Sequence, residues 1–433
     1  MSERGLFNQL RTSLDRIPVI DTHEQMGRWG YAPSPGAEEM LRRLMPREAA
    51  GMLRRRLVSA GLTREPGGMN GITALLDAAK NTSVYHYVLA ALADLFSFQS
   101  KEINDANWRF LSDQIAQRTA DPAWPSEVLR DKAKIEVALS SHISLTPEMP
   151  RWAQGLFVPL LRVDHFLLLP GSAQGLRMLE QRYNVSLKGL NDVLGLIERT
   201  IRAAAENGFA GLRTRLASFR TLHIENVTPS DVQGFIERGK RDLTREQAKR
   251  LQDLMFHAIV QCAIKHKLPI QIDAGLGGAG TSSLDRANPL HLTDMIFNYA
   301  DARFAILHGG FPFTGEAAVL AKTFPNIYLD GSWVRHASFS TAKAVLHEWL
   351  EVVPCSKIMI WGGNSRCPEA AYLSLLMTKD LVAEVLAEKV ESGYLGERLA
   401  VDIAWKLFRE NARAFYNLAQ RRPSPAHQGR TPA

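Results

Sequence analysis

The chain has 433 residues, of which 45% are hydrophobic and 22% are charged, as in an ordinary folded protein. This composition excludes a disordered, collagen-like or fibrous protein. The 52 basic residues exceed the 45 acidic residues only modestly, and much of the surplus lies in residues 42–56 and in the tail after residue 420. Because such charge runs usually form solvated surfaces, we expect no nucleic-acid partner.

Cysteine content and hydropathy both bear on the compartment. The three cysteines, Cys262, Cys355 and Cys367, are too scattered for a disulfide framework or a structural zinc site. The first residues, MSERGLFNQL, carry charges where a secretory signal needs an apolar run. No uncharged apolar stretch reaches the ~18 residues of a membrane span. We therefore expect a cytoplasmic protein in a reducing compartment, without membrane contact.

Hydrophobic runs of strand length recur along the chain. They lie at 18–23, 133–140, 157–168, 209–216, 269–275, 304–309, 326–333 and 358–365. From the fourth run onward, helix-like segments separate them, at 246–267, 289–299, 315–323 and 341–352. Alternating strands and helices predict parallel strands with right-handed crossovers, and eight such units close into a barrel. The sequence thus predicts an α/β fold, the TIM (β/α)8 barrel.

The segment 31–132 is too long for one crossover and has apolar residues at helical spacing over 40–60 and 72–98, with turn signals at Pro46 and 66–68. We predict a helical insertion after strand one, on the catalytic face of the barrel. Two further helices are predicted at 368–392 and 398–418. The expected organisation is one barrel domain over 1–420 that includes the insertion, with a disordered tail over 421–433.

In a TIM barrel, polar residues at the carboxyl ends of the strands meet in one cleft. The first strand ends in DTHEQ, which places His23 and Gln25 two residues apart. The fourth ends at Arg213, the fifth at Asp273 and the sixth at His308. The seventh and eighth runs end in DGSW and GGNS, the latter containing Asn364. These residues are the candidates for chemistry.

The same stretches carry a family resemblance over about residues 16–418. It rests on IPVIDTHE, LPIQIDAGLG, ILHGGFPFTGE, PNIYLDGSW, PCSKIMIWGGNS and RENARAFYNL, in that order and spacing. The chain resembles the amidohydrolase-related (amidohydrolase-2) family of the amidohydrolase superfamily, in particular its branch allied to uronate isomerases. The resemblance implies a divalent metal, usually zinc, at the barrel mouth. Its ligands would be a His-x-His pair on strand one, a strand-five histidine and a strand-eight aspartate, assisted by a strand-six histidine and in some members a strand-four lysine.

The chain departs from this implied ligand set. His23 and His308 match, but Gln25, Asp273 and Asn364 replace a histidine, a histidine and an aspartate, and Arg213 replaces the lysine. An amide lacks the charge and basicity that activate a water, and it is a poor zinc ligand. Arginine brings a permanent positive charge, whose repulsion from one unit of ionic charge is ~4 kcal/mol at ~4 Å and an effective dielectric of about 20. We therefore expect no cofactor.

Two arrangements of the altered residues remain open. In the first, Arg213 forks onto the Asp273 carboxylate from the neighbouring strand and occupies the position of the metal. In the second, a single divalent metal such as zinc is retained by His23, Gln25 and Asp273, or by a rebuilt tripod of His23, Asp273 and His308. The first arrangement is favoured.

Each candidate also has a purely structural interpretation. His23 can be a hydrogen-bonded core histidine, Asp273 a buried salt-bridge partner, and His308 and Asn364 residues of glycine-containing turns. Further candidates lie just beyond strand ends and have the chemistry to clamp a carboxylate, with ordinary packing as the alternative. They are Arg28, Trp29, Trp333, Arg335 and Arg366, with Asn364 as a further substrate-binding residue.

Two classes of function fit these residues. One is an amidohydrolase-like enzyme on a small anionic substrate, performing hydrolysis of a C–N or C–O bond, decarboxylation or isomerisation. In it, His308 or Asp273 acts as base, His23 polarises and Arg213 holds an oxyanion. The other is an inactive amidohydrolase-fold binding protein. Because the cleft keeps ionisable groups, we favour the enzyme, with a homo-oligomer possible.

Overall fold

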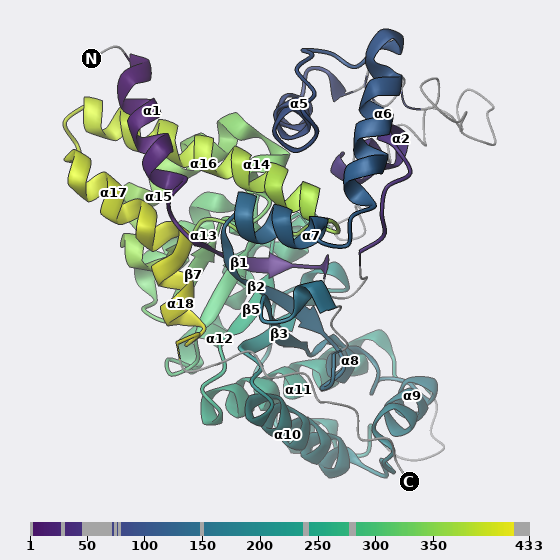
Figure 1. Ribbon diagram of the computed structural model, residues 1–433. Coiled ribbons are helices and arrows are strands. Elements are labelled where there is room, and N and C mark those ends of the chain that lie inside the picture. The colour runs from purple at the N-terminus through teal and green to yellow at the C-terminus, as the bar shows by residue number, and fades with distance from the viewer. Residues whose placement is uncertain are drawn as a thin grey trace.

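The computed structural model describes residues 3–26, 31–45, 72, 76, 79–147, 151–236, 242–276 and 283–419. Eight strands within these ranges pair in parallel in the order of the sequence (Figure 1). They are β1 Val19–Glu24, β2 Ile135–His142, β3 Phe157–Arg162, β4 Gly211–Thr214, β5 Ile270–Asp273, β6 Phe304–Leu307, β7 Ile327–Asp330 and β8 Ile358–Met359. Each predicted hydrophobic run contains one of them, so the predicted TIM barrel is confirmed.

The barrel is closed between its first and last strands by contacts that follow β8. The Thr22 amide and hydroxyl both donate to the Trp361 carbonyl oxygen, at 3.3 and 3.0 Å. The Asn364 amide donates to the His23 carbonyl oxygen at 2.6 Å. This closure brings the end of β1 against the residues after β8, which is the arrangement the site requires.

Six predicted strand runs are longer than the strands in the structure, and two of them show why. The run 157–168 leaves the sheet after Arg162 and continues as α8, which begins at Asp164, since an acidic residue is favourable in the first turn of a helix. The run 358–365 pairs only at its first two residues. Beyond them the backbone lies so close to β1 that a Cβ on Gly362 would be 2.8 Å from the His23 Cβ. Only glycine fits there.

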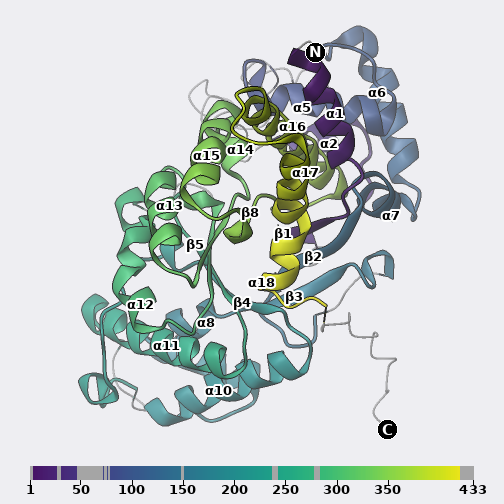
Figure 2. The ribbon, with the colours of Figure 1, turned by 90° about the vertical axis from the view of Figure 1, so that its left-hand side faces the viewer.

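Helices cover the outside of the barrel (Figures 1 and 2). Those on the barrel are α1 Glu3–Leu14, α8 Asp164–Leu168, α9 Ala173–Tyr183, α10 Leu190–Glu206, α11 Arg245–Lys265, α12 Thr293–Asn298, α13 Thr314–Thr323, α14 Val334–Ala337, α15 Phe339–Val352, α16 Pro368–Glu391, α17 Glu397–Trp405 and α18 Asn411–Phe415. The helix predicted over 289–299 begins as a 3₁₀ turn, Pro289–Leu292. The helix predicted over 398–418 is divided by a π turn, Lys406–Glu410.

The predicted insertion between β1 and β2 is helical wherever it is described. It contains α2 Ala37–Leu44, α5 Ser83–Phe96, α6 Asp105–Thr119, α7 Trp124–Ser126 and a π turn, Glu127–Lys132. Figures 1 and 2 both show α2, α5 and α6 grouped beside α16. Their apolar side chains share a core with Leu373 and Met377 of α16. The buried Glu369 carboxylate accepts from Trp124 Nε1 at 2.7 Å and from the Tyr31 hydroxyl at 3.4 Å, which ties the insertion to the barrel.

The described part of the insertion differs from prediction at one helix. The run 72–98 does not form one helix, because Thr82 caps a new one, α5, by accepting a hydrogen bond from the Tyr85 amide at 3.4 Å. The second half of the helix predicted over 40–60, from residue 46, and the tail over 421–433 lie outside the described residues.

The interior of the barrel is apolar in its lower part. It is filled by seven apolar side chains from the strands and their starts, Ile20, Leu139, Val158, Leu160, Ala210, Ala305 and Met359. The base of the barrel is closed by Ala412 and Phe415 of α18 and by Tyr416, which follows α18. A larger apolar layer packs between the barrel and the outer helices. The polar residues of the strand ends are therefore gathered at the opposite, carboxyl end. No helix among the described residues is long and apolar enough to cross a membrane.

Candidate active site

Four predicted residues from four different strand ends meet at the barrel mouth. His23 comes from β1, Arg213 from β4 and Asp273 from β5, and His308 follows β6 directly. Each is buried, with 1, 4, 5 and 7% of its surface exposed, in that order. Parallel strands bring these distant sequence positions together because their carboxyl ends form one rim.

Arg213 is the centre of this cluster. Its Nη2 donates to both oxygens of Asp273, at 3.0 and 3.1 Å, and its Nε lies 3.3 Å from Oδ1. Its Nη1 lies 2.8 Å from His23 Nδ1. The predicted fork between Arg213 and Asp273 is present, and the contact with His23 was not predicted. One guanidinium thus joins β1, β4 and β5.

Asp273 is held as a carboxylate by this environment. Burial alone raises the pKa of a carboxyl group, but the adjacent Arg213 and the two histidines together lower the pKa of Asp273 well below its usual range. His308 Nε2 lies 3.8 Å from Asp273 Oδ2. The carboxylate is therefore negative at neutral pH and lies beside His308, which makes no hydrogen bond with Arg213 among the described residues.

His23 is fixed in one tautomer. A guanidinium has only donors, so His23 Nδ1 must accept from Arg213 and the ring proton must be on Nε2. Burial, followed by the charge of Arg213, lowers the pKa of His23 well below its usual value, which keeps the ring neutral. Nε2 is buried and has no hydrogen-bond partner among the described residues. His23 therefore presents an unsatisfied N–H donor.

His308 occupies a strained backbone position. Its φ is +60°, in the left-handed region that costs a residue with a side chain about 1–3 kcal/mol. The two glycines after it complete the turn, and a Cβ on Gly309 would lie 2.8 Å from Val334. The ring packs 5.3 Å from the His23 ring, and its Nδ1 lies 3.5 Å from the Ser332 hydroxyl. The strain sets the imidazole beside both His23 and Asp273.

The remaining altered positions form a second pair. The Gln25 amide nitrogen donates to the Asn364 side-chain oxygen, so the two amides satisfy one another. Asn364 also has a left-handed backbone, with φ +49°. The buried Glu24 Oε1 accepts from the amides of Gln25 and Ser365, at 2.6 and 2.9 Å, and so holds the ends of β1 and β8 together.

These contacts can be compared with a metal site of the kind the resemblance implies. His23 Nδ1 and both Asp273 oxygens are bonded to the Arg213 guanidinium, and the remaining His23 nitrogen, Nε2, carries the ring proton and so has no lone pair for an ion. Gln25 and Asn364 are bonded to each other. Among the described residues, no three His, Cys, Asp or Glu side chains lie where they could hold a metal ion. The residues present do not fit a divalent ion, either in the implied set or in the rival tripod.

The other predicted substrate-binding residues are placed differently. Arg28 and Trp29 lie outside the described residues. Trp333 joins the cluster, with its ring edge-on to His308 at 6.3 Å. Arg366 is exposed just after β8, and no contact of it with the cluster is seen in the described residues.

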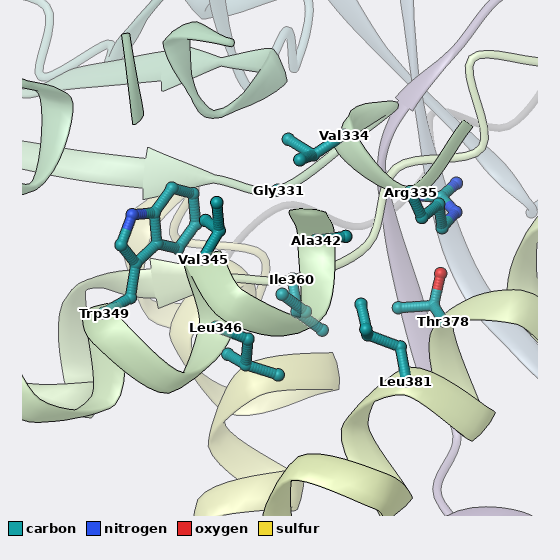
Figure 3. Close-up of a pocket in the computed structure, with 10 residues that line it drawn as sticks. All are labelled: Gly331, Val334, Arg335, Ala342, Val345, Leu346, Trp349, Ile360, Thr378 and Leu381. Atoms are coloured by element: carbon teal, nitrogen blue, oxygen red, sulfur yellow. The ribbon is translucent and has the colours of Figure 1, made fainter. Parts of the chain in front are cut away.

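Arg335 does not fit its predicted role as a carboxylate clamp. It is 1% exposed, and its guanidinium donates to the carbonyl oxygens of Gly362 and Ser374 at 3.0 Å each. Arg335 also lines a small cavity of about 10 Å³. Figure 3 shows it beside the other lining residues, which include Trp349 of α15 and Leu381 of α16. The left-handed backbone of Trp333 turns the chain so that Arg335 faces the outer helices.

Three strand-end residues of the site were assigned no role from the sequence. Arg215, the second residue after Arg213, has its Nε 3.6 Å from Asp273 Oδ2. Asp164 accepts from the Arg162 guanidinium at 2.9 Å and from the Arg215 amide at 2.7 Å. Glu24 was read only as part of a motif. The strand-end positions of Arg215 and Asp164 were the available signal, but only the structure shows which strand-end side chains meet.

Comparisons with known proteins agree with this architecture. A family model described as amidohydrolase, Amidohydro_2, matches residues 187–418, which is more than half of the chain. Protein fluG of Emericella nidulans is 31% identical over 237 residues, 52% of this chain. The match spans only 27% of the length of that relative.

Solved structures share the fold at low sequence identity. A uronate isomerase from Thermotoga maritima is 15% identical, with a TM-score of 0.79 over 95% of this chain and 97% of its own. A glucuronate isomerase from Caulobacter crescentus is also 15% identical, with a TM-score of 0.77 over 98% of this chain and 97% of its own. The matched family range contains β4 to β8 and three of the four clustered residues. The chain is therefore a member of the amidohydrolase family.

Proposed function

We propose that this amidohydrolase-family protein is a metal-independent enzyme that isomerises a small anionic carbonyl compound by proton transfer at carbon. The observation that carries the proposal is the Arg213 guanidinium, which bonds His23 and Asp273 where the family places an ion. The arginine leaves the site with a neutral donor, a carboxylate and a second histidine. These are the groups that proton abstraction next to a carbonyl requires.

His23 supplies the electrophile. Its Nε2–H is buried without a partner, and an unsatisfied buried donor costs about 1–3 kcal/mol, which a bound carbonyl oxygen would recover. When a C–H bond next to that carbonyl breaks, its electron pair moves into an enolate and negative charge develops on the oxygen. A neutral imidazole held by Arg213 donates to this oxygen without itself ionising.

His308 supplies the base. Its Nε2 receives the proton from carbon and becomes cationic, and the Asp273 carboxylate at 3.8 Å stabilises that charge. The substrate carries a hydroxyl group on the carbon that loses the proton, so the intermediate is an enediolate. Return of the same proton to the former carbonyl carbon, with transfer of the hydroxyl proton to the former carbonyl oxygen, leaves the carbonyl on the neighbouring carbon, so atoms and electrons balance without a redox partner. Arg213 keeps Asp273 ionised throughout the cycle.

Isomerisation is favoured over hydrolysis by the eighth strand. Hydrolysis in this family depends on a carboxylate at the position of Asn364 to activate water, and an amide bonded to Gln25 has no such basicity. Two of the solved structures that share the fold bear the names of uronate and glucuronate isomerases, and another is named a putative metal-dependent hydrolase. This makes oxo- and hydroxy-carboxylic acids of graded length the first compounds to test, with uronates at the long end of the panel.

The test is exchange of substrate hydrogen for deuterium in D₂O, followed by proton NMR over a panel of such acids. We expect exchange by protein dialysed against a chelator, at the rate of untreated protein. His308→Gln should lower kcat by about 10²–10⁴-fold, since that is the contribution of a positioned base. The matched control is His347→Gln, a histidine outside the cluster that pairs with Glu388.

Two results would overturn the proposal. Loss of exchange on chelation with recovery on adding zinc would show a metal enzyme. Binding of acids without exchange in any member of the panel would identify the second predicted class, a ligand-binding protein.

A further inference from the structure

Among the described residues, Arg215 is the most accessible of the three arginines at the ends of β3 and β4, Arg162, Arg213 and Arg215. Its side chain is 37% exposed, against 4% for Arg213, and its Nε lies 3.6 Å from Asp273 Oδ2. Both oxygens of that carboxylate already accept shorter bonds from Arg213. Arg215 is therefore near the carboxylate but is not its hydrogen-bonded partner.

The backbone of Arg215 is firmly held although its guanidinium is not. The Arg215 amide donates to Asp164 Oδ1 at 2.7 Å, and the Thr214 hydroxyl donates to the same oxygen at 3.0 Å. The other oxygen of Asp164 accepts from Arg162 at 2.9 Å. The chain thus fixes the Cα of Arg215 at the rim and leaves its charged end for another partner.

The charges of this rim do not balance. Three guanidinium groups, of Arg162, Arg213 and Arg215, face two carboxylates, of Asp164 and Asp273. Each carboxylate is paired with a different arginine, through bonds of 2.9 and 3.0 Å. One positive charge remains, and it belongs to the most exposed of the three arginines. A planar, permanently charged fork with unused donors is suited to a carboxylate.

We infer that Arg215 binds the carboxylate of the substrate and sets the length of the acid that the site accepts. This inference rests on the proposed function for the position of the reacting carbon at His308. Arg215 Nε and His308 Nε2 lie 3.6 and 3.8 Å from the same oxygen, Asp273 Oδ2, so they are no further apart than the sum of these distances. The substrate is therefore a short acid whose carboxylate lies only a few bonds from the carbonyl.

The test is a binding titration that needs no turnover. The probes are pyruvate, levulinate and 6-oxoheptanoate, which differ in the distance from carboxylate to carbonyl, and pyruvamide as an uncharged analogue. Isothermal titration calorimetry of the full chain gives each Kd. We expect Arg215→Gln to raise the Kd of pyruvate and of levulinate at least about tenfold, and Arg215→Lys to raise both by less. Neither variant should change the Kd of pyruvamide.

The matched control is Arg250→Gln. Arg250 is 42% exposed and pairs with one carboxylate, Asp231, at 3.4 Å, which resembles the situation of Arg215. Arg250→Gln should bind all four probes as the natural protein does. Far-ultraviolet circular dichroism and the thermal midpoint of each variant check that the fold is retained.

The inference and the proposed function fail in different ways. Equal carboxylate affinity in the natural protein and Arg215→Gln, or no carboxylate binding by either, would overturn the role of Arg215 whatever the deuterium exchange shows. The length limit would be overturned if 6-oxoheptanoate bound as strongly as pyruvate and levulinate and if Arg215→Gln weakened that binding. Arg215-dependent binding without exchange would support the inference while the proposed chemistry fails.

Discussion

The two ends of the barrel differ in the groups that their hydrogen bonds join. At the base, the Tyr416 hydroxyl accepts from Gln271 at 2.7 Å and Arg303 donates to the Phe415 carbonyl oxygen at 2.8 Å, around an apolar core. At the mouth, buried charges are paired by Arg213, and His23 Nε2 is left without a partner. The base thus holds few polar groups within an apolar core, whereas the mouth concentrates buried charged and ionisable side chains.

The difference shows where the family scaffold tolerates change. The substituted positions are all at the mouth, and they satisfy one another in pairs, Arg213 with Asp273 and Gln25 with Asn364. A buried charge is costly unless it is paired, so these substitutions are compatible with folding only together. Variants that separate the pairs, or that alter the base alone, test this contrast.

The largest effect on stability is expected from Arg213→Leu. The variant leaves the Asp273 carboxylate buried without its partner, so the free energy of unfolding should fall by about 3–5 kcal/mol in urea at pH 7. The double variant Arg213→Leu with Asp273→Leu has neither charged side chain, so no carboxylate is buried without a partner. Its free energy of unfolding should lie within about 1 kcal/mol of that of the natural protein. A double variant less stable than the single one would contradict the pairing argument.

A smaller effect is expected at the base from Tyr416→Phe. Loss of the hydroxyl removes one hydrogen bond from Gln271, whose nitrogen still donates to the Thr22 carbonyl oxygen at 2.7 Å. The free energy of unfolding should fall by about 1 kcal/mol. Carboxylate affinity, measured by calorimetry, should be unchanged. A loss of binding comparable to that of Arg215→Gln would remove the distinction between base and mouth.

The smallest effect concerns Lys357, just before β8. Burial lowers the pKa of Lys357 to about 8. Because the folded pKa lies below that of the unfolded chain, the unfolded chain binds more protons between pH 8 and about 10.5, and stability should rise with pH there. The amine is half-exposed, so we expect less than about 1 kcal/mol. The free energy of unfolding, measured with urea at pH 8 and pH 10, should rise less in Lys357→Met than in the natural protein. An equal rise in both proteins would contradict the prediction.

Several features of the site could be predicted because they depend on strand order. Strands four and five of a parallel barrel are neighbours, so an arginine and an aspartate at their ends were expected to meet, as Arg213 and Asp273 do. The pairing of Gln25 with Asn364 and the contact of Arg213 with His23 were not predicted. Both depend on how the barrel closes and on side-chain direction, which spacing along the chain does not give.

Arg335 shows why a strand-end position alone is insufficient evidence. It lies five residues beyond the end of β7, and the backbone at Trp333, with φ +72°, turns it toward α16. Backbone conformation after a strand depends on packing against neighbouring elements. The same uncertainty explains why Arg215 was not singled out, although it stands two residues after Arg213.

The amino-acid sequence determined the eight-stranded barrel, its helical insertion and the altered residues at the strand ends, because hydrophobic periodicity and chain order are local properties. The tertiary structure decided the tautomer of His23, the left-handed backbone of His308 and the exposure of Arg215. These depend on contacts between residues on different strands, up to 190 positions apart for His23 and Arg213. Charge pairing and burial across the barrel mouth therefore determine how the side chains of this site are arranged on the shared TIM barrel.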